Sequence, residues 1–347
     1  IDLYFWTMNE IFFYTSLFIF GTLFGSFASV LIYRLKSGEK WILNGRSHCG
    51  KCNTTLQAKD LIPVFSWLKN LWRCGYCKDK ISSVYPLLEI STGSLFALVW
   101  YFLIDISNIF IGAISEFILL LFWLIIAFIT ILYIFYDLLF LEIHEWIMAT
   151  WIFFMITGIL AQMIFPELII FQNLPNNMMS IWNLAIWWVV TIFLLAWAYT
   201  IMTRELDEKI DIVIVWLSIA LIYFTAHFTG IEMWNFALTS WLAAAGGIFL
   251  FFFLQILISK WAWLWGWDLR IAIMIGLWLW ISLWFAWMML TYILGSFISI
   301  FYLVYQRIKN KWKNIETQIP FWPFLALWFF SAIFFQTNIQ NFISIYF

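Results

Sequence analysis

Ten runs of about 20 mostly apolar residues follow one another along the chain, and each is long enough to cross a bilayer as a helix. With 65% hydrophobic and 11% charged residues, the chain lies far from the composition of soluble proteins. We therefore predict an all-α, polytopic membrane protein with about ten transmembrane helices. The net charge of −1 gives no indication of nucleic-acid binding. The expected helices span 11–34, 84–104, 117–136, 146–165, 181–202, 212–229, 234–258, 271–288, 290–306 and 321–345.

The distribution of Lys and Arg indicates the orientation of these helices. Cytoplasmic loops of membrane proteins collect basic residues. If the N-terminus lies outside, all 18 Lys and Arg fall on the cytoplasmic side, and the segment from Arg34 to Lys80 alone carries ten of them. We therefore expect a protein of the cytoplasmic membrane with segment 35–83 in the cytoplasm. The chain begins at Ile1 without a basic region or cleavage site, so the first run is expected to be a retained helix rather than a signal peptide.

All four cysteines of the chain lie in this cytoplasmic segment, as Cys49-x2-Cys52 and Cys74-x2-Cys77 with 21 residues between the pairs. Two such pairs supply four thiolates for a tetrahedral Zn²⁺, and a closed four-sulfur shell is typical of structural sites. Two disulfides are the alternative, which the reducing cytoplasm disfavours. His48 adjoins the first cysteine and is interpreted as a bystander. We expect metal binding to supply much of the folding free energy of this loop.

Two aspartates are expected at the same membrane depth. Asp137 comes at the cytoplasmic end of the third predicted helix, and Asp268 comes just before the eighth, at the same face. Each could merely cap a helix or rest in the interface. If packing brings them together, repulsion between the carboxylates leaves one protonated and one ionised, an arrangement that can activate water against an amide.

Several motifs in this order resemble the type IV prepilin peptidases, a family of membrane aspartyl proteases that also N-methylate the processed pilin. The resemblance covers nearly the whole chain. It is carried by "GSFASVLIYRL" (25–35), the double cysteine motif with "DLIPVFSWL" between its halves, "YPLLEISTGSLFAL" (85–98), "YDLLFLEIHEW" around Asp137, the region of Asp268, and "IPFWPFLAL" (319–327).

The resemblance implies that Asp137 and Asp268 are the catalytic residues and that Cys49, Cys52, Cys74 and Cys77 are the metal ligands. It further implies type IV prepilins or pseudopilins as substrates and S-adenosylmethionine as a methyl donor. We associate methyl transfer with the cysteine loop and with Glu89, although Glu89 could merely complement the dipole of its helix. No residue pattern independently demands that cofactor.

The chain departs from the family at several positions. Ser29 stands where Asn is usual, and Ile143-His144-Glu145 replaces Ile-Pro-Asp after the first aspartate. His144 is interpreted as an interfacial residue rather than a base. The two aspartates are also unusually far apart, which suggests two additional helices near 181–229. We therefore expect a first helix (1–34), a metal-binding loop domain (35–83) and a transmembrane peptidase domain with that insertion (84–347).

Tryptophan replaces glycine at several motif positions. The family motif Gly-x-Gly-Asp reads Trp265-Gly266-Trp267-Asp268 here, and Trp72, Trp280, Trp322 and Trp328 also stand at family glycines. The chain has 26 Trp but only 15 Gly. We predict that Trp265, Trp267, Trp322 and Trp328 are encoded by UGA in an organism that reads this codon as glycine. The alternative, an interfacial belt of genuine indoles, does not explain their coincidence with motif glycines.

Two other function classes stay open at the level of the sequence. An ion- or proton-coupled transporter would also place carboxylates within the membrane, and a metal-stabilised scaffold would need only the cysteine loop. Neither accounts for the order of the motifs.

Overall fold

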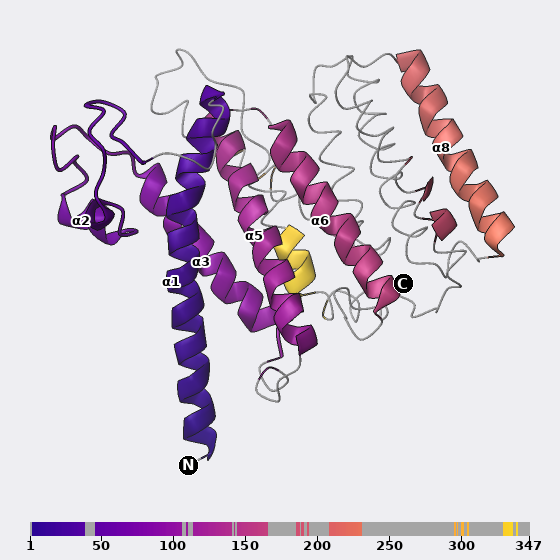
Figure 1. Ribbon diagram of the computed structural model, residues 1–347, viewed down its shortest axis with the longest axis horizontal. Coiled ribbons are helices and arrows are strands. Elements are labelled where there is room, and N and C mark those ends of the chain that lie inside the picture. Colours follow the sequence, from indigo (N-terminus) through magenta and orange to yellow (C-terminus); the bar gives the residue numbers. More distant parts are fainter. Residues whose placement is uncertain are drawn as a thin grey trace. The chain divides into compact units, whose positions relative to one another are not determined.

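The computed structural model describes residues 2–38, 46–105, 109, 114–140, 142, 144–165, 185–187, 189–190, 193, 208–230, 295, 297, 300, 301, 304, 329–335 and 338. The chain divides into two compact units, Ile1–Phe154 with Ser299–Phe330, and Met155–Ile298 with Ser331–Phe347. The described elements are α1 (Asp2–Ser37), the 3₁₀ helix η1 (Ala58–Asp60), α2 (Phe65–Lys69), α3 (Val84–Leu103), α5 (Ile114–Phe140), α6 (Glu145–Ile164) and α8 (Glu208–Thr229) (Figure 1).

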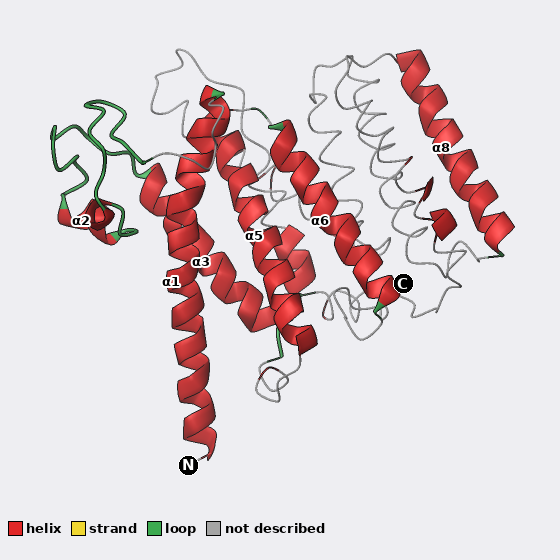
Figure 2. Ribbon diagram, in the orientation of Figure 1, coloured by secondary structure: helices red, strands yellow, loops and turns green. Residues whose placement is uncertain are grey.

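The predicted all-α class is confirmed for the part of the chain that the structure describes. Figure 2 shows long helices, with a looped segment around α2. Three of the described helices are long and apolar enough to cross a membrane, at Glu10–Ser37, Val84–Leu103 and Ile114–Phe140. The count of ten stays a prediction, because 234–258 and 271–288 lie outside the described residues.

The ends of the membrane helices follow from local sequence. α1 stops at Ser37 because Gly38 adopts a φ of +69°, a left-handed conformation that terminates helices at low cost for glycine. Arg34 and Lys36 in its last turn complement the negative end of the helix dipole. α3 carries Pro86 in its first turn, where a missing backbone N–H leaves no helical hydrogen bond unmade.

Helices α1 and α3 pack backbone to backbone through small residues. A Cβ atom added to Gly21 would lie 2.7 Å from the Cα of Gly93, and one added to Gly25 would lie 2.6 Å from the Cα of Glu89. Gly21 and Gly25 are four residues apart, so they form a small stripe on one face of α1. Close approach through such stripes is the usual basis of helix association in membranes.

Helix α5 completes this three-helix core. Phe24 of α1 contacts Phe96 of α3 and Phe128 of α5, with ring centroids 6.0 Å and 5.5 Å away. In the most apolar window of α5, 67% of the residues are buried, against 33% for α1. α5 is therefore the most enclosed of the three spans, and it carries Asp137 in its last turn.

Candidate active site and metal centre

The two Cys-x2-Cys motifs fold into two copies of one backbone turn. Isolated antiparallel bridges join His48 to Thr55 and Arg73 to Lys80, each from one residue before the first cysteine to three after the second. The N–H of Cys49 donates to the carbonyl of Thr54 at 3.0 Å, and the N–H of Cys74 donates to that of Asp79 at 2.8 Å. Every partner in the second turn lies 25 residues after its counterpart.

Each turn closes through a residue with positive φ at the same relative position. These residues are Asn53 (φ 53°) and Lys78 (φ 62°), and their N–H groups donate to the carbonyls of Cys49 and Cys74 at 2.9 Å and 3.0 Å. The tight turn brings both thiols of a motif to one side. The 25-residue repeat of the motif therefore corresponds to a repeat of the structure.

The four thiols converge on one point. The Sγ atoms of Cys49, Cys52, Cys74 and Cys77 lie within 4.8 Å of one another, and those of Cys49 and Cys77 are 3.9 Å apart. All four cysteines carry free thiols in the structure. Four sulfurs around a Zn²⁺ at about 2.3 Å are close to 3.8 Å apart, so the cluster fits a tetrahedral ion. His48 is not part of the cluster.

The thiols of this cluster differ in acidity. Hydrogen bonds from the side chain and then the backbone of Thr54 lower the pKa of Cys52 to about 6. The Asp79 backbone lowers the pKa of Cys77, but burial and the three neighbouring thiols outweigh it and raise the value to about 11. A backbone hydrogen bond with Cys77 also lowers the pKa of Cys74. The cluster therefore favours ionisation of Cys52 and Cys74 and opposes that of Cys77, and a bound cation would balance the added negative charge.

Glu89 fastens the cysteine loop to α3. Its side chain is buried, with 7% exposed, and its Oε2 accepts the N–H of Val64 at 2.6 Å. The hydroxyl of Ser26 on α1 also interacts with this carboxylate. Val64 is the residue before α2 and has a φ of 59°, which a β-branched side chain disfavours. This contact has no sequence signature, because 25 residues separate its partners.

Asp137 lies in the last turn of α5, which continues to Phe140 rather than ending before the aspartate as the predicted boundary had it. Its side chain is only 6% exposed. An ionisable side chain buried at that level of a membrane helix is a functional candidate by default, because its burial is costly.

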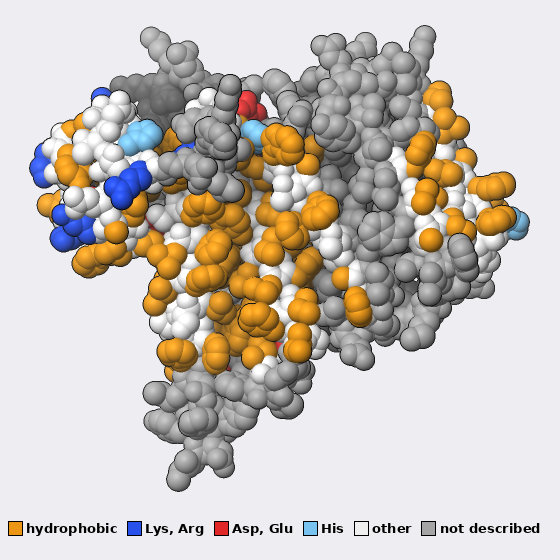
Figure 3. Space-filling view, viewed as in Figure 1, with side chains coloured by type: hydrophobic (Ala, Val, Ile, Leu, Met, Phe, Trp, Pro, Cys, Tyr) orange, Lys and Arg blue, Asp and Glu red, His pale blue; other side chains and the backbone are white. Residues whose placement is uncertain are grey.

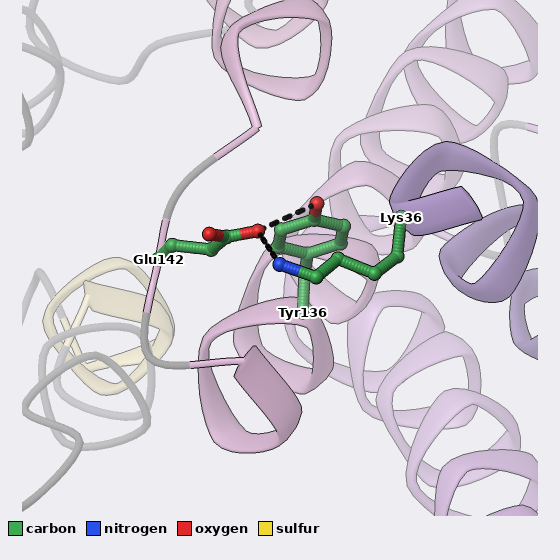
Figure 4. A network of polar contacts seen from close by, with 3 residues as sticks. All are labelled: Lys36, Tyr136 and Glu142. Carbon is green, nitrogen blue, oxygen red and sulfur yellow. Dashed lines mark hydrogen bonds and ion pairs between the residues drawn. The ribbon is translucent and has the colours of Figure 1, made fainter. Parts of the chain in front are cut away.

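A polar network closes around the segment that follows Asp137. The ammonium of Lys36, at the end of α1, lies 2.5 Å from Oε1 of Glu142, and the Tyr136 hydroxyl donates to the same oxygen at 3.2 Å (Figure 4). Lys36 also lies 5.0 Å from the centre of the Phe140 ring. The hydrogen bond from Lys36 lowers the pKa of Glu142. Sequence reasoning missed this network, whose only signal was a lone acid after the helix.

His144 acts as a helix cap. Its Nδ1 accepts the N–H of Trp146 at 3.3 Å, and its carbonyl accepts the N–H of Ile147, so it satisfies donors at the start of α6. This local role agrees with its interpretation as an interfacial residue rather than a base.

The other predicted site residues lie outside the described part of the chain. These are Asp268, the motif tryptophans Trp265, Trp267, Trp322 and Trp328, and Trp280. The pairing of Asp137 with Asp268 therefore stays a prediction, as does the insertion near 181–229.

Comparison with known proteins identifies the N-terminal part of the chain. Residues 19–103 match the bacterial peptidase A24 N-terminal domain, and they comprise the second half of α1, the cysteine loop and α3. A prepilin leader peptidase/N-methyltransferase of Myxococcus xanthus is 41% identical over 80 residues, which is 23% of this chain and 24% of that protein. The corresponding protein of Bacillus subtilis is 40% identical over 81 residues, or 23% and 32% of the two chains.

A third relative carries a different name. A type 4 prepilin-like proteins leader peptide-processing enzyme of Escherichia coli is 47% identical over 58 residues, which is 16% of this chain and 22% of the relative. The chain thus spans between 22% and 32% of the length of these three relatives in the matched part. No solved structure matches this chain.

Proposed function

We propose that this chain is a membrane-embedded aspartyl endopeptidase of the type IV prepilin peptidase family, because residues 19–103 match the bacterial peptidase A24 N-terminal domain and resemble prepilin leader peptidases. Its proposed substrates are type IV prepilins or pseudopilins, from which it removes the leader peptide at the cytoplasmic face of the cytoplasmic membrane. The observation that supports this most directly is the family match over the cysteine loop, combined with a buried aspartate in α5 at a motif position.

Asp137 and Asp268 form the proposed catalytic pair. One ionised carboxylate takes a proton from water as the water oxygen attacks the scissile carbonyl carbon. The other carboxyl, kept protonated by its neighbour's charge, donates its proton to the carbonyl oxygen. Collapse of the tetrahedral intermediate then breaks the C–N bond and the leaving amine takes up a proton. The buried position of Asp137 supports this role. Exclusion of water strengthens the electrostatic interactions of the carboxyl groups with the attacking water and with the carbonyl oxygen.

The cysteine loop has a structural part in this proposal. Cys49, Cys52, Cys74 and Cys77 would hold a zinc ion in a closed shell, which supplies a cross-link between the two turns and no open coordination position. Glu89 would hold that loop on the membrane helices through Val64. N-methylation with S-adenosylmethionine is the second proposed activity, and it rests on the names of the relatives.

Substitution of the aspartates tests the peptidase. Asp137→Asn and Asp268→Asn should each lower the rate of prepilin cleavage by roughly 10²–10⁴-fold, because each removes a proton-transfer group. The assay is leader removal by the purified full-length protein, followed by gel shift and mass spectrometry. Asp105→Asn is the matched control, since this exposed acid follows the far end of α3 and should leave the rate unchanged.

Full activity in either aspartate variant would refute the proposed pair. Ion flux in liposomes without any leader cleavage would instead support the transporter. The same reaction with a labelled methyl donor measures the second activity, and cleavage without label would leave only a peptidase.

A further inference from the structure

The segment between the two cysteine turns exposes several large apolar side chains. Phe65 is 59% exposed, Leu68 52% and Leu71 66%, although each is a large hydrophobic side chain. An exposed apolar patch of this kind marks a site of contact with a protein or a membrane. The surface, called here the α2 surface, consists of Leu61, Ile62, Phe65, Leu68, Leu71 and Trp72.

Basic side chains surround the α2 surface. Residues 46–83 contain seven Lys and Arg but only two acidic residues, so the loop stays positively charged even with four thiolates around a zinc ion. Lys59, Lys69 and Arg73 are exposed within or next to the apolar segment. Figure 3 shows blue basic and orange hydrophobic side chains side by side in the region that Figure 1 labels α2. Apolar and cationic groups on one surface match the two layers of a membrane interface.

The covalent structure holds this surface near a bilayer. The loop leaves the membrane at the end of α1 and re-enters it at the start of α3, and both helices are candidate spans. The hydrogen bond from Val64 to Glu89 ties the residue before α2 to the second turn of α3. A tether of this kind gives the surface a high effective concentration at the nearby headgroups.

We propose that the α2 surface docks onto the anionic lipid headgroups of the leaflet from which α1 and α3 emerge. Phe65, Leu68 and Leu71 insert into the interface, while Lys59, Lys69 and Arg73 contact lipid phosphates. A soluble partner would need an apolar centre surrounded by acidic groups. An anionic leaflet supplies both apolar acyl chains and negatively charged phosphates, and it lies next to the ends of α1 and α3 that hold the loop. The inference depends on α1 and α3 spanning the membrane and not on the proposed peptidase activity.

Photo-crosslinking identifies what covers the α2 surface. The full chain carries a photoreactive phenylalanine analogue at Phe65 or at Leu71, with the analogue at Lys51 in the first cysteine turn as the matched control. The proteins are reconstituted in nanodiscs of phosphatidylglycerol or of phosphatidylcholine, irradiated, and examined by mass spectrometry. We expect lipid adducts at positions 65 and 71, several-fold more in the anionic nanodiscs than in the neutral ones, and few at position 51.

A charge variant and two competitors complete the test. Lys59→Gln combined with Lys69→Gln should reduce the adducts in anionic nanodiscs several-fold while the metal content stays unchanged, since neither residue contributes to the cysteine cluster. Equal lipid adducts at positions 51, 65 and 71 would overturn the proposal. Adducts to a second copy of the chain or to added prepilin, in place of lipid, would overturn it as well. Because adducts are scored without cleavage, loss of peptidase activity cannot be mistaken for loss of docking.

Discussion

At the scale of single residues, the backbone of Trp72 is in a conformation suited to glycine. Its φ is +52°, and the chain is held there by hydrogen bonds on both sides, from its own N–H to the carbonyl of Trp67 and from the N–H of Ile81 to its carbonyl. The left-handed backbone conformation costs a residue with a Cβ atom about 1–2 kcal/mol. Trp72 is also one of the positions where the resembling family has glycine. The conformation is compatible with glycine at position 72 but is not specific for it, because Leu71 and three other non-glycine residues of the loop also have positive φ.

Replacement of Trp72 by Gly and by Ala separates the backbone from the side chain. Both variants lose the contact of the indole with Trp67, whose ring centroid is 5.3 Å away, but only glycine relieves the strain. Glycine removes the cost of the left-handed conformation, but it also increases the entropy of the unfolded chain, which offsets part of this gain. We therefore expect the free energy of unfolding of Trp72→Gly to be larger than that of Trp72→Ala by about 0.5–1 kcal/mol. Thermal unfolding of the full chain in detergent measures this difference. Equal stability would mean that the left-handed conformation carries no cost. The codons at Trp265, Trp267, Trp322 and Trp328 test the rest of the hypothesis.

At the scale of elements, one ion pair joins the end of α1 to the segment after α5. Lys36 and Glu142 are each about 40% exposed, so their attraction is screened and worth on the order of 0.5 kcal/mol. The lowered pKa of Glu142 fixes the sign of its pH dependence. The stabilisation is complete above the ordinary carboxyl pKa of 4.5, and it is lost as the pH falls through the lower pKa of the folded state.

A double-mutant cycle measures this link between α1 and α5. Lys36→Gln and Glu142→Gln should show a coupling on the order of 0.5 kcal/mol in unfolding at pH 7, and the coupling should disappear well below pH 4.5. The pair Lys51 and Asp79 is the control, because these groups are 3.8 Å apart and the lysine is 75% exposed. Coupling that persists at low pH, or that equals the control at neutral pH, would contradict the assigned contact.

Sequence patterns predicted local features of these elements well and distant contacts poorly. The bounds 84–104 and 146–165 differ from those of α3 and α6 by one residue at most, because apolar runs and flanking polar residues determine helix ends. The four-sulfur cluster followed from motif spacing in the same way. The contact of Lys36 with Glu142, 106 residues apart, leaves no periodic trace in the sequence. Asp137 was identified by its motif, but the helix that buries it runs one turn further than hydropathy indicated.

At the scale of the whole molecule, the contact of Lys36 with Glu142 bears on topology. It brings the C-terminal end of α1 and the segment after α5 together, so as candidate membrane spans α1 and α5 run in the same direction and α3 runs in the other. We therefore expect the cysteine loop, which follows α1, and Asp137, near the end of α5, to lie on one side of the membrane. This agrees with the alternation that the Lys and Arg distribution predicts.

Reporter fusions decide which side that is. Alkaline phosphatase is active only outside the cytoplasm, and green fluorescent protein folds well only inside it. In fusions that end at residue 108, between α3 and α5, the phosphatase should be active and the green fluorescent protein should not fluoresce. Fusions that end at residue 60 in the cysteine loop, or at Glu142, should behave in the opposite way, because the basic loop stays in the cytoplasm. If the reporters at residue 60 and at Glu142 gave different results, the shared face would be wrong. If both were outside, the cysteines would face an oxidising compartment, in which disulfides form readily and the proposed thiolate metal site loses its physical basis.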